Sequence, residues 1–193
     1  GLGDVYKRQI KARGLRVQSF VGDFTLDPVN VYDDTTKMPP AKLIVVALKA
    51  TAKADYVRLV RPLVRDDSII LCLQNGLGNE DLFAQAFGAH RVLGAIAYTC
   101  INRLGPGEVA HTAHGKLRIG EFASNDTTRA AAIAEAFVRA QVPAEAVSDL
   151  RLFRWHKLVW NIPFNGWGAA LDLHSAALLA TKEGEQPVSY THL

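Results

Sequence analysis

Short apolar runs alternate along the chain with polar loops that contain glycine or proline, and this pattern predicts most of the secondary structure. Alternating runs at 15–18 and 24–26 flank a Gly-Asp pair, which predicts a hairpin or two short strands. Residues 33–40 form a polar loop that ends in proline. Two continuous apolar runs follow at 43–48 and 68–73, and such runs are typical of strands covered on both faces.

A βαβ unit is predicted around these two runs. Residues 51–64 carry apolar side chains at helical spacing, with a proline near the end. Strand, helix and strand within about thirty residues almost always cross right-handed, with the strands parallel. Lys49 and Asn75 follow the two strands, and in open α/β sheets the carboxyl ends of the strands hold the ligand. The pattern therefore predicts a binding edge that contains both residues.

The middle of the chain continues the predicted sheet. We expect a short helix at 80–87 and a strand at 91–100, then two short antiparallel strands at 108–112 and 116–122 with a turn at Gly115. An alanine-rich helix at 127–140, capped by Asn125 or Asp126, and a short edge strand at 142–147 follow. From residue 150 the pattern becomes helical and richer in aromatics, so we place a domain boundary near Ser148 and expect a second apolar helix, whole or interrupted, at 169–180.

A polar stripe lies within the aromatic run 154–165. Lys157, Asn161 and Asn165 recur at every fourth position, which places them on nearly the same face of a helix. Asparagine is a poor helix former, so its repetition is unusual for a solvated face. Two interpretations stay open: a surface stripe with asparagines near a helix end, or a polar strip that lines a cleft.

Composition narrows the class of protein. A net charge of +3, with 49% hydrophobic and 21% charged residues, is ordinary for a globular protein and gives no argument for nucleic acid. No apolar run reaches membrane-spanning length. Cys72 and Cys100 lie in apolar strand-like runs, so we interpret them as reduced core residues of a cytoplasmic protein. His111 and His114 would point to opposite faces of a strand without acidic or cysteine partners, so no metal site is expected.

The two ends of the chain look foreign to the fold. The hexapeptide at 4–9 can be encoded by GATGTGTATAAGAGACAG, and the reverse complement of that DNA, extended by one base, encodes the hexapeptide at 188–193. Both resemble a transposase-end sequencing adapter read in opposite directions. We therefore expect 1–9 and 188–193 to be non-native and 10–187 to be an internal piece of a longer gene.

Three motifs coincide in order and spacing: a strand that ends in Leu-Lys49-Ala, a strand followed by Gln-Asn75-Gly-Leu-Gly, and Lys157-x-x-x-Asn161-x-x-x-Asn165. Together they resemble the ketopantoate reductase (2-dehydropantoate 2-reductase) family over nearly all of 10–180. The resemblance implies an α/β fold: a Rossmann-like NADP-binding domain at 10–148 that lacks its first βα unit. The first helices of an all-α substrate domain, similar to the C-terminal domain of 6-phosphogluconate dehydrogenase, would follow at 149–187.

The same resemblance implies roles for particular residues. Lys157 matches the catalytic proton donor, and Asn161 and Asn165 match asparagines that contact the substrate. Lys49 and Asn75 match residues at the nicotinamide end of NADPH, with Asn75 also near the substrate, and Cys100 falls where a backbone contact to the cofactor is expected. The implied reaction is reduction of ketopantoate to pantoate in pantothenate and coenzyme A synthesis.

The chain departs from the family pattern in ways that leave alternatives open. The glycine-rich turn that should hold the pyrophosphate is not in the chain, and the loop 74–81 is a poor substitute because Glu80 and Asp81 would repel phosphate. We therefore expect this chain alone to bind NADPH weakly or not at all and to be inactive. Pro163 is expected to kink the helix between the two asparagines. A paralogue that reduces another 2-keto acid or an imine, a non-catalytic Rossmann-like binding protein, and a homodimer all remain alternatives.

Overall fold

The computed structural model describes residues 2–49, 53–172 and 177. Two compact units divide the chain, an N-terminal unit (Gly1–Ser148) and a C-terminal unit (Asp149–Leu193).

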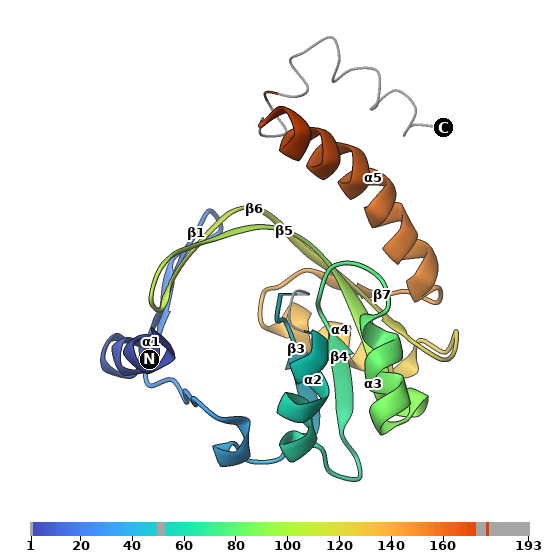
Figure 1. Ribbon diagram of the computed structural model, residues 1–193, viewed down its shortest axis with the longest axis horizontal. Helices are drawn as coiled ribbons and strands as arrows, with labels where there is room; N and C mark the ends of the chain where they lie inside the picture. Colours follow the sequence, from blue (N-terminus) through green and yellow to red (C-terminus); the bar gives the residue numbers. More distant parts are fainter. Residues whose placement is uncertain (1, 50–52, 173–176, 178–193) are drawn as a thin grey trace. The chain divides into compact units, whose positions relative to one another are not determined.

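One seven-stranded mixed sheet forms the centre of the N-terminal unit (Figure 1). Its strands run in the order β2-β1-β6-β5-β4-β3, and β7 pairs with β6. The strands are β1 (Leu15–Ser19), β2 (Phe24–Leu26), β3 (Leu43–Val46), β4 (Ile69–Cys72), β5 (Val92–Gly105), β6 (Glu108–Glu121) and β7 (Ala144–Ala146).

In the part of the N-terminal unit that the structure describes, four α-helices and three short 3-10 turns accompany this sheet. The helices are α1 (Leu2–Arg13), α2 (Lys53–Val60), α3 (Asn79–Phe87) and α4 (Thr128–Arg139), and the 3-10 turns are η1 (Thr35–Lys37), η3 (Arg61–Leu63) and η4 (Ala89–Arg91). Helix α1 contains the hexapeptide at 4–9, and Lys7 within it forms an ion pair with Asp33 at 2.8 Å. The adapter origin of that hexapeptide stays a prediction.

The predicted βαβ unit is confirmed. Strand β3 pairs in parallel with β4, and β4 pairs in parallel with β5. The hairpin of β1 and β2 and the antiparallel pairing of β5 with β6 are confirmed as well. Residues from α2 and α3 pack with β3 and β4 in one hydrophobic cluster, whereas α4 packs with β4, β5 and β6 in another.

Two expectations about the long strands were wrong. Strand β5 does not end at Cys100 but continues to Gly105, and β6 is one strand where two with a turn at Gly115 were expected. Tyr98 pairs with Lys116 and the next residue of β5 pairs with His114, so Gly115 is an extra residue in β6. Its φ of 130° lies in a region open to glycine, which lets the bulge form without ending the strand.

The expectation that β3 is covered on both faces was also wrong. Ile44 and Val46 are buried, but Leu43 and Val45 are 37% and 44% exposed. The reason is the position of β3 at the end of the strand order, because the main contacts of α4 are with β6 and β7. An apolar run therefore indicated a strand here, but not the number of its covered faces.

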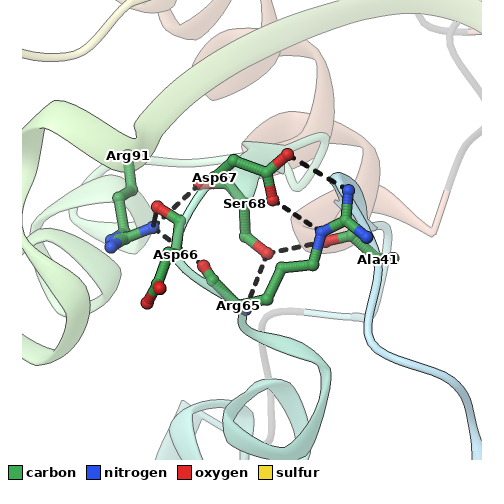
Figure 2. Close-up of polar contacts among 6 residues, drawn as sticks. All are labelled: Ala41, Arg65, Asp66, Asp67, Ser68 and Arg91. Atoms are coloured by element: carbon green, nitrogen blue, oxygen red, sulfur yellow. Dashed lines mark hydrogen bonds and ion pairs between the residues drawn. The ribbon is translucent and has the colours of Figure 1, made fainter.

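The amino edge of the parallel strands is closed by a polar network (Figure 2). The buried Ser68 hydroxyl donates to the carbonyl of Ala41 at 2.6 Å and accepts from the backbone N–H of Arg65 at 2.9 Å. The guanidinium of Arg91 donates to the carbonyl of Arg65 at 3.0 Å and to that of the following residue at 2.7 Å. The turn before β4 is thus fixed to the residues that precede β3.

The C-terminal unit is described mainly by one helix, α5 (Leu150–Leu171). The side chain of Asp149 caps it by accepting from the N–H of Leu152 at 2.8 Å. The helix is assigned without interruption through Pro163. Residues 169–171 of the predicted second apolar helix belong to α5, and most of the remainder lies outside the described residues. Among the helices described, none is long and apolar enough to span a membrane.

Candidate functional site

Lys49 and Asn75 lie beyond the carboxyl ends of two neighbouring parallel strands. The last paired residues of β3 and β4 are Val46 and Cys72, and each of the two polar residues comes three positions later. Both side chains are exposed. The structure therefore places Lys49 and Asn75 at one edge of the sheet, where open α/β sheets bind ligands.

Glycines shape the loop that contains Asn75. Gly76 and Gly78 have φ values of 90° and 79°, which are accessible to glycine and strained for most other residues. Gly78 is also the N-terminal cap of α3, so the chain turns sharply from β4 into that helix.

The carbonyls of both edge residues accept hydrogen bonds from side chains that sequence reasoning did not single out. The hydroxyl of Tyr56, in α2, donates to the carbonyl of Lys49. The side-chain Nδ2 of Asn79, the first residue of α3, donates to the carbonyl of Asn75 at 3.0 Å. In the sequence, Tyr56 is one more apolar position of a helical pattern and Asn79 one more polar residue after a glycine, so neither could be distinguished.

Cys100 lies on the long antiparallel arm formed by β5 and β6 (Figure 1), away from a strand end. It pairs with Ala113 beside a register shift, and its carbonyl accepts from the hydroxyl of Thr112 at 3.3 Å. The expectation that both cysteines belong to the core holds only for Cys72, because Cys100 is exposed. The apolar run around Cys100 belongs to a strand that extends beyond the helices covering the sheet. Among the described residues, neither cysteine forms a disulfide.

The polar stripe lies on α5, but its members differ in burial. Lys157 and Asn161 are half-buried, whereas Asn165 is exposed. A step of four residues turns a helix by about 40° beyond one full turn, so Asn165 lies about 80° around the axis from Lys157. Arg154 and Phe164, which are 5% and 6% exposed, lie on the same side of the helix as Lys157. The interpretation as an entirely solvated surface stripe therefore does not fit Lys157 and Asn161.

The environment of Lys157 favours its neutral form. Burial lowers the pKa of its ammonium group below the ordinary value of a lysine, and the nearby positive charge of Arg154 lowers this pKa further. Arg154 precedes Lys157 by three residues, which places the two side chains on neighbouring turns. A lysine in such a setting gives up its proton more readily than a surface lysine does.

The opposite side of α5 is apolar and exposed. Leu152, Trp155, Val159 and Ile162 follow one another at three- and four-residue spacing, and each is between 46% and 62% exposed. A shallow pocket of about 400 Å³ lies beside this stripe, lined by Ile162, Pro163, Gly166, Trp167 and Ala170. His156 packs edge-on against Phe153, with ring centroids 5.8 Å apart.

The candidate residues therefore form two groups. Lys49 and Asn75 share an edge of the N-terminal unit, and Lys157 and Asn161 share a face of α5 in the C-terminal unit. Among the residues that the structure describes, no group of three or more histidine, cysteine or acidic side chains could hold a metal ion.

Comparisons with known proteins identify the family. The family model described as "Ketopantoate reductase PanE/ApbA" matches residues 3–124, a range that includes Lys49, Asn75 and Cys100. A 2-dehydropantoate 2-reductase of Nostoc sp. is 40% identical over 177 residues, covering 89% of this chain and 56% of the relative. A protein of the same name from Halobacterium salinarum is 28% identical over 178 residues, covering 92% of this chain and 58% of the relative. The chain thus spans little more than half the length of these two relatives.

Solved structures agree with the sequence relatives. The structure of 2-dehydropantoate 2-reductase from Geobacter metallireducens has a TM-score of 0.88 and 40% identity, covering 95% of this chain and 66% of that one. The enzyme from Methylococcus capsulatus has a TM-score of 0.80 and 30% identity, covering 93% and 59%. The predicted Rossmann-like α/β fold is confirmed by these matches. The chain belongs to the ketopantoate reductase PanE/ApbA family.

Proposed function

We propose that this protein reduces 2-dehydropantoate to pantoate with NADPH, a step of pantothenate and coenzyme A synthesis. The single observation that carries the proposal is a half-buried lysine with a lowered pKa, in helical register with two asparagines, in a member of the ketopantoate reductase family. The relatives' names support the substrate.

The edge of the sheet suits the nicotinamide end of the cofactor. When bound, NADPH supplies the hydride for the reduction. Lys49 offers a positive charge and Asn75 an amide that can both donate and accept hydrogen bonds, and both side chains are exposed at this edge. We assign these two residues to the nicotinamide end, Asn75 also to the substrate, and the backbone of Cys100 to a further cofactor contact.

Lys157 suits the protonation step. Negative charge builds on the carbonyl oxygen of the keto acid as the carbon accepts the hydride, and a positioned ammonium group can stabilise and then protonate that oxygen. The lowered pKa of Lys157 makes this proton transfer easier. We assign Asn161 and Asn165 to the substrate, because amides orient a hydroxyl and a carboxylate without adding charge beside the lysine.

NADPH and a cytoplasmic location are parts of this proposal. One structural neighbour with 20% identity and a TM-score of 0.84 is a D-mandelate dehydrogenase bound to NADH and anilino(oxo)acetate, and that likeness concerns the fold alone. Cys72 and Cys100 form no disulfide among the described residues, which suits a reducing compartment and supports the location.

A direct test measures NADPH oxidation in the presence of 2-dehydropantoate. The assay uses this chain and, because the relatives are longer, also the open reading frame of the source gene that contains it. In the active form, Lys157→Ala should lower turnover by roughly 10²–10⁴-fold, the usual contribution of a positioned acid. Lys42→Ala, which alters an exposed lysine, is the control. Unchanged turnover in Lys157→Ala would defeat the mechanism.

Reduction of a different 2-keto acid is the alternative that the sequence favours next. Gly166 and Trp167 directly follow the last asparagine of the polar stripe, and both are exposed on α5. A comparison of kcat/KM for 2-dehydropantoate with that for other 2-keto acids and imines decides the substrate. A higher value for any of those compounds would assign the protein to a paralogous reductase, and activity with none would favour a binding protein.

A further inference from the structure

Lys49 and Asn75 occupy the same kind of position and are held in the same way. Both lie beyond the last ladder pair of their strands, Val46 with Cys72, so the pairing of β3 and β4 does not fix their backbones. In each case the carbonyl accepts a hydrogen bond from a side chain of the next helix. The donor to the carbonyl of Lys49 is the hydroxyl of Tyr56. The donor to the carbonyl of Asn75 is Nδ2 of Asn79, at 3.0 Å.

The two donors are themselves buried side chains. Tyr56 and Asn79 are each 1% exposed, although each carries a polar group. The ring of Tyr56 stacks on that of Phe83 in α3 with a centroid distance of 6.4 Å, and Phe83 is fully buried. Both donors therefore belong to helices that pack against the sheet, and the contact between Tyr56 and Phe83 links α2 to α3.

We propose that Tyr56 and Asn79 are positioning residues that fix the backbone from which Lys49 and Asn75 project toward the nicotinamide cofactor. Functional side chains must be held within about half an ångström of their productive geometry, and this needs a rigid supporting layer. An exposed strand-end loop without such bonds would sample several backbone states. The inference rests on the proposed function for the identity of the ligand, but the anchoring itself can be measured without any ligand.

The test uses variants that remove one donor and keep the shape of the side chain. Tyr56→Phe deletes the hydroxyl alone. Asn79→Leu replaces the amide by an apolar group of similar size, which suits the site because Oδ1 of Asn79 is buried and has no hydrogen-bond partner among the described residues. The matched controls are Tyr32→Phe and Asn125→Leu, which change exposed residues of the same type.

The first readout is NMR of the isotope-labelled 193-residue chain without ligand. Tyr56→Phe should shift the carbonyl resonance of Lys49 and average the couplings about its N–Cα bond, which report the backbone, leaving Asn75 unchanged. Asn79→Leu should have the same two effects on Asn75 and leave Lys49 unchanged. If these hydrogen bonds contributed to stability alone, both variants would have a lower melting temperature but their couplings would not be averaged. That result would overturn the proposal.

The second readout is NADP+ affinity in a double-mutant cycle, measured by titration to millimolar concentrations. Tyr56→Phe should weaken binding roughly 3- to 10-fold when Lys49 is present, the range of one hydrogen bond, and less than about 2-fold in the Lys49→Ala background. Equal losses in both backgrounds would show that Tyr56 does not act through Lys49. If the open reading frame of the source gene that contains this chain binds no NADP+, the proposed cofactor site is wrong, while the ligand-free couplings still decide the anchoring.

Discussion

At both edges of the parallel strands, side chains donate hydrogen bonds to backbone carbonyls, but these bonds have different roles at the two edges. At the amino edge, Ser68 and Arg91 donate to backbone carbonyls, and their polar groups are engaged in joining the turn before β4 to its neighbours (Figure 2). At the carboxyl edge, Tyr56 and Asn79 also donate to backbone carbonyls, but the residues they hold present exposed side chains of their own.

Because of this difference, changes at the amino edge should affect mainly stability, and changes at the carboxyl edge mainly ligand binding. At the amino edge the bonded side chain is itself the structural element, so its loss should lower the free energy of unfolding. At the carboxyl edge the anchor and the presented side chain are different residues. Lys49 or Asn75 can therefore be replaced without removing a buried hydrogen bond donor, and the effect should fall on ligand binding and catalysis.

The largest effect is expected at the carboxyl edge. Lys49→Ala should lower kcat/KM by about 100-fold in the active form of the enzyme, comparable to the loss of one electrostatic contact to the reacting groups. The free energy of unfolding should change by less than about 0.5 kcal/mol, because Lys49 is exposed. Steady-state kinetics and chemical denaturation measure the two quantities. A stability loss as large as that of Arg91→Ala would erase the distinction between the edges.

Arg91→Ala should lower the free energy of unfolding by about 2 kcal/mol, because three backbone carbonyls of the turn before β4 lose a charged donor. Urea denaturation measures this change. Arg139→Ala is the control, since Arg139 is exposed and its ion pair with Glu135 is long at 3.9 Å. If the two variants are equally stable, the amino-edge network is not a structural element.

Ser68→Ala should cost somewhat less, about 1.5 kcal/mol. The hydroxyl is a neutral group, but it is buried and bonds both Ala41 and Arg65, so its removal leaves two backbone groups without a partner. Ser124→Ala, at an exposed serine, serves as the reference in the same denaturation experiment. NADP+ affinity should not change, and a parallel loss of affinity would mean that the two edges are coupled.

The smallest effect is expected for Asp67→Asn, although Asp67 forms an ion pair with Arg65 at 2.6 Å in the same network. The hydrogen bond from Arg65 lowers the pKa of the Asp67 carboxyl, but the group is exposed to solvent, which screens the pair. A lowered pKa in the folded state adds stability above the unfolded pKa, and this contribution is lost as pH falls through the folded pKa. The difference between wild type and variant should therefore be small at pH 7 and disappear in acid; a difference that grows in acid would contradict the assignment.

Much of the fold could be predicted because apolar periodicity and turn residues are local signals. The βαβ unit and the β1–β2 hairpin follow from runs bounded by glycine or polar residues. Features that depend on partners distant in sequence could not be predicted. The continuity of β6 through Gly115 requires the register of β5, and the open face of β3 requires knowledge of where α4 packs.

The candidate site shows the same limit. Helical spacing places Lys157 and Asn161 on one face, and strand ends place Lys49 and Asn75 on one edge, so residue types at fixed offsets were sufficient to select them. The burial that lowers the pKa of Lys157 and the carbonyl bonds from Tyr56 and Asn79 arise only in three dimensions. The exposure of Cys100 could not be predicted either, because the apolar residues of β5 and β6 do not indicate that these two strands form a long arm.

The pH dependence of kcat/KM for NADPH-dependent reduction of 2-dehydropantoate tests the central claim most directly. A proton donor must be protonated, so the rate should fall as pH rises through the pKa of Lys157, which burial and Arg154 place below the ordinary 10.5 of lysine. In Lys157→Ala the residual rate should lose this alkaline decline. A decline that persists unchanged in Lys157→Ala, or a wild-type rate that stays level up to pH 10.5, would contradict the assignment of Lys157 as the proton donor.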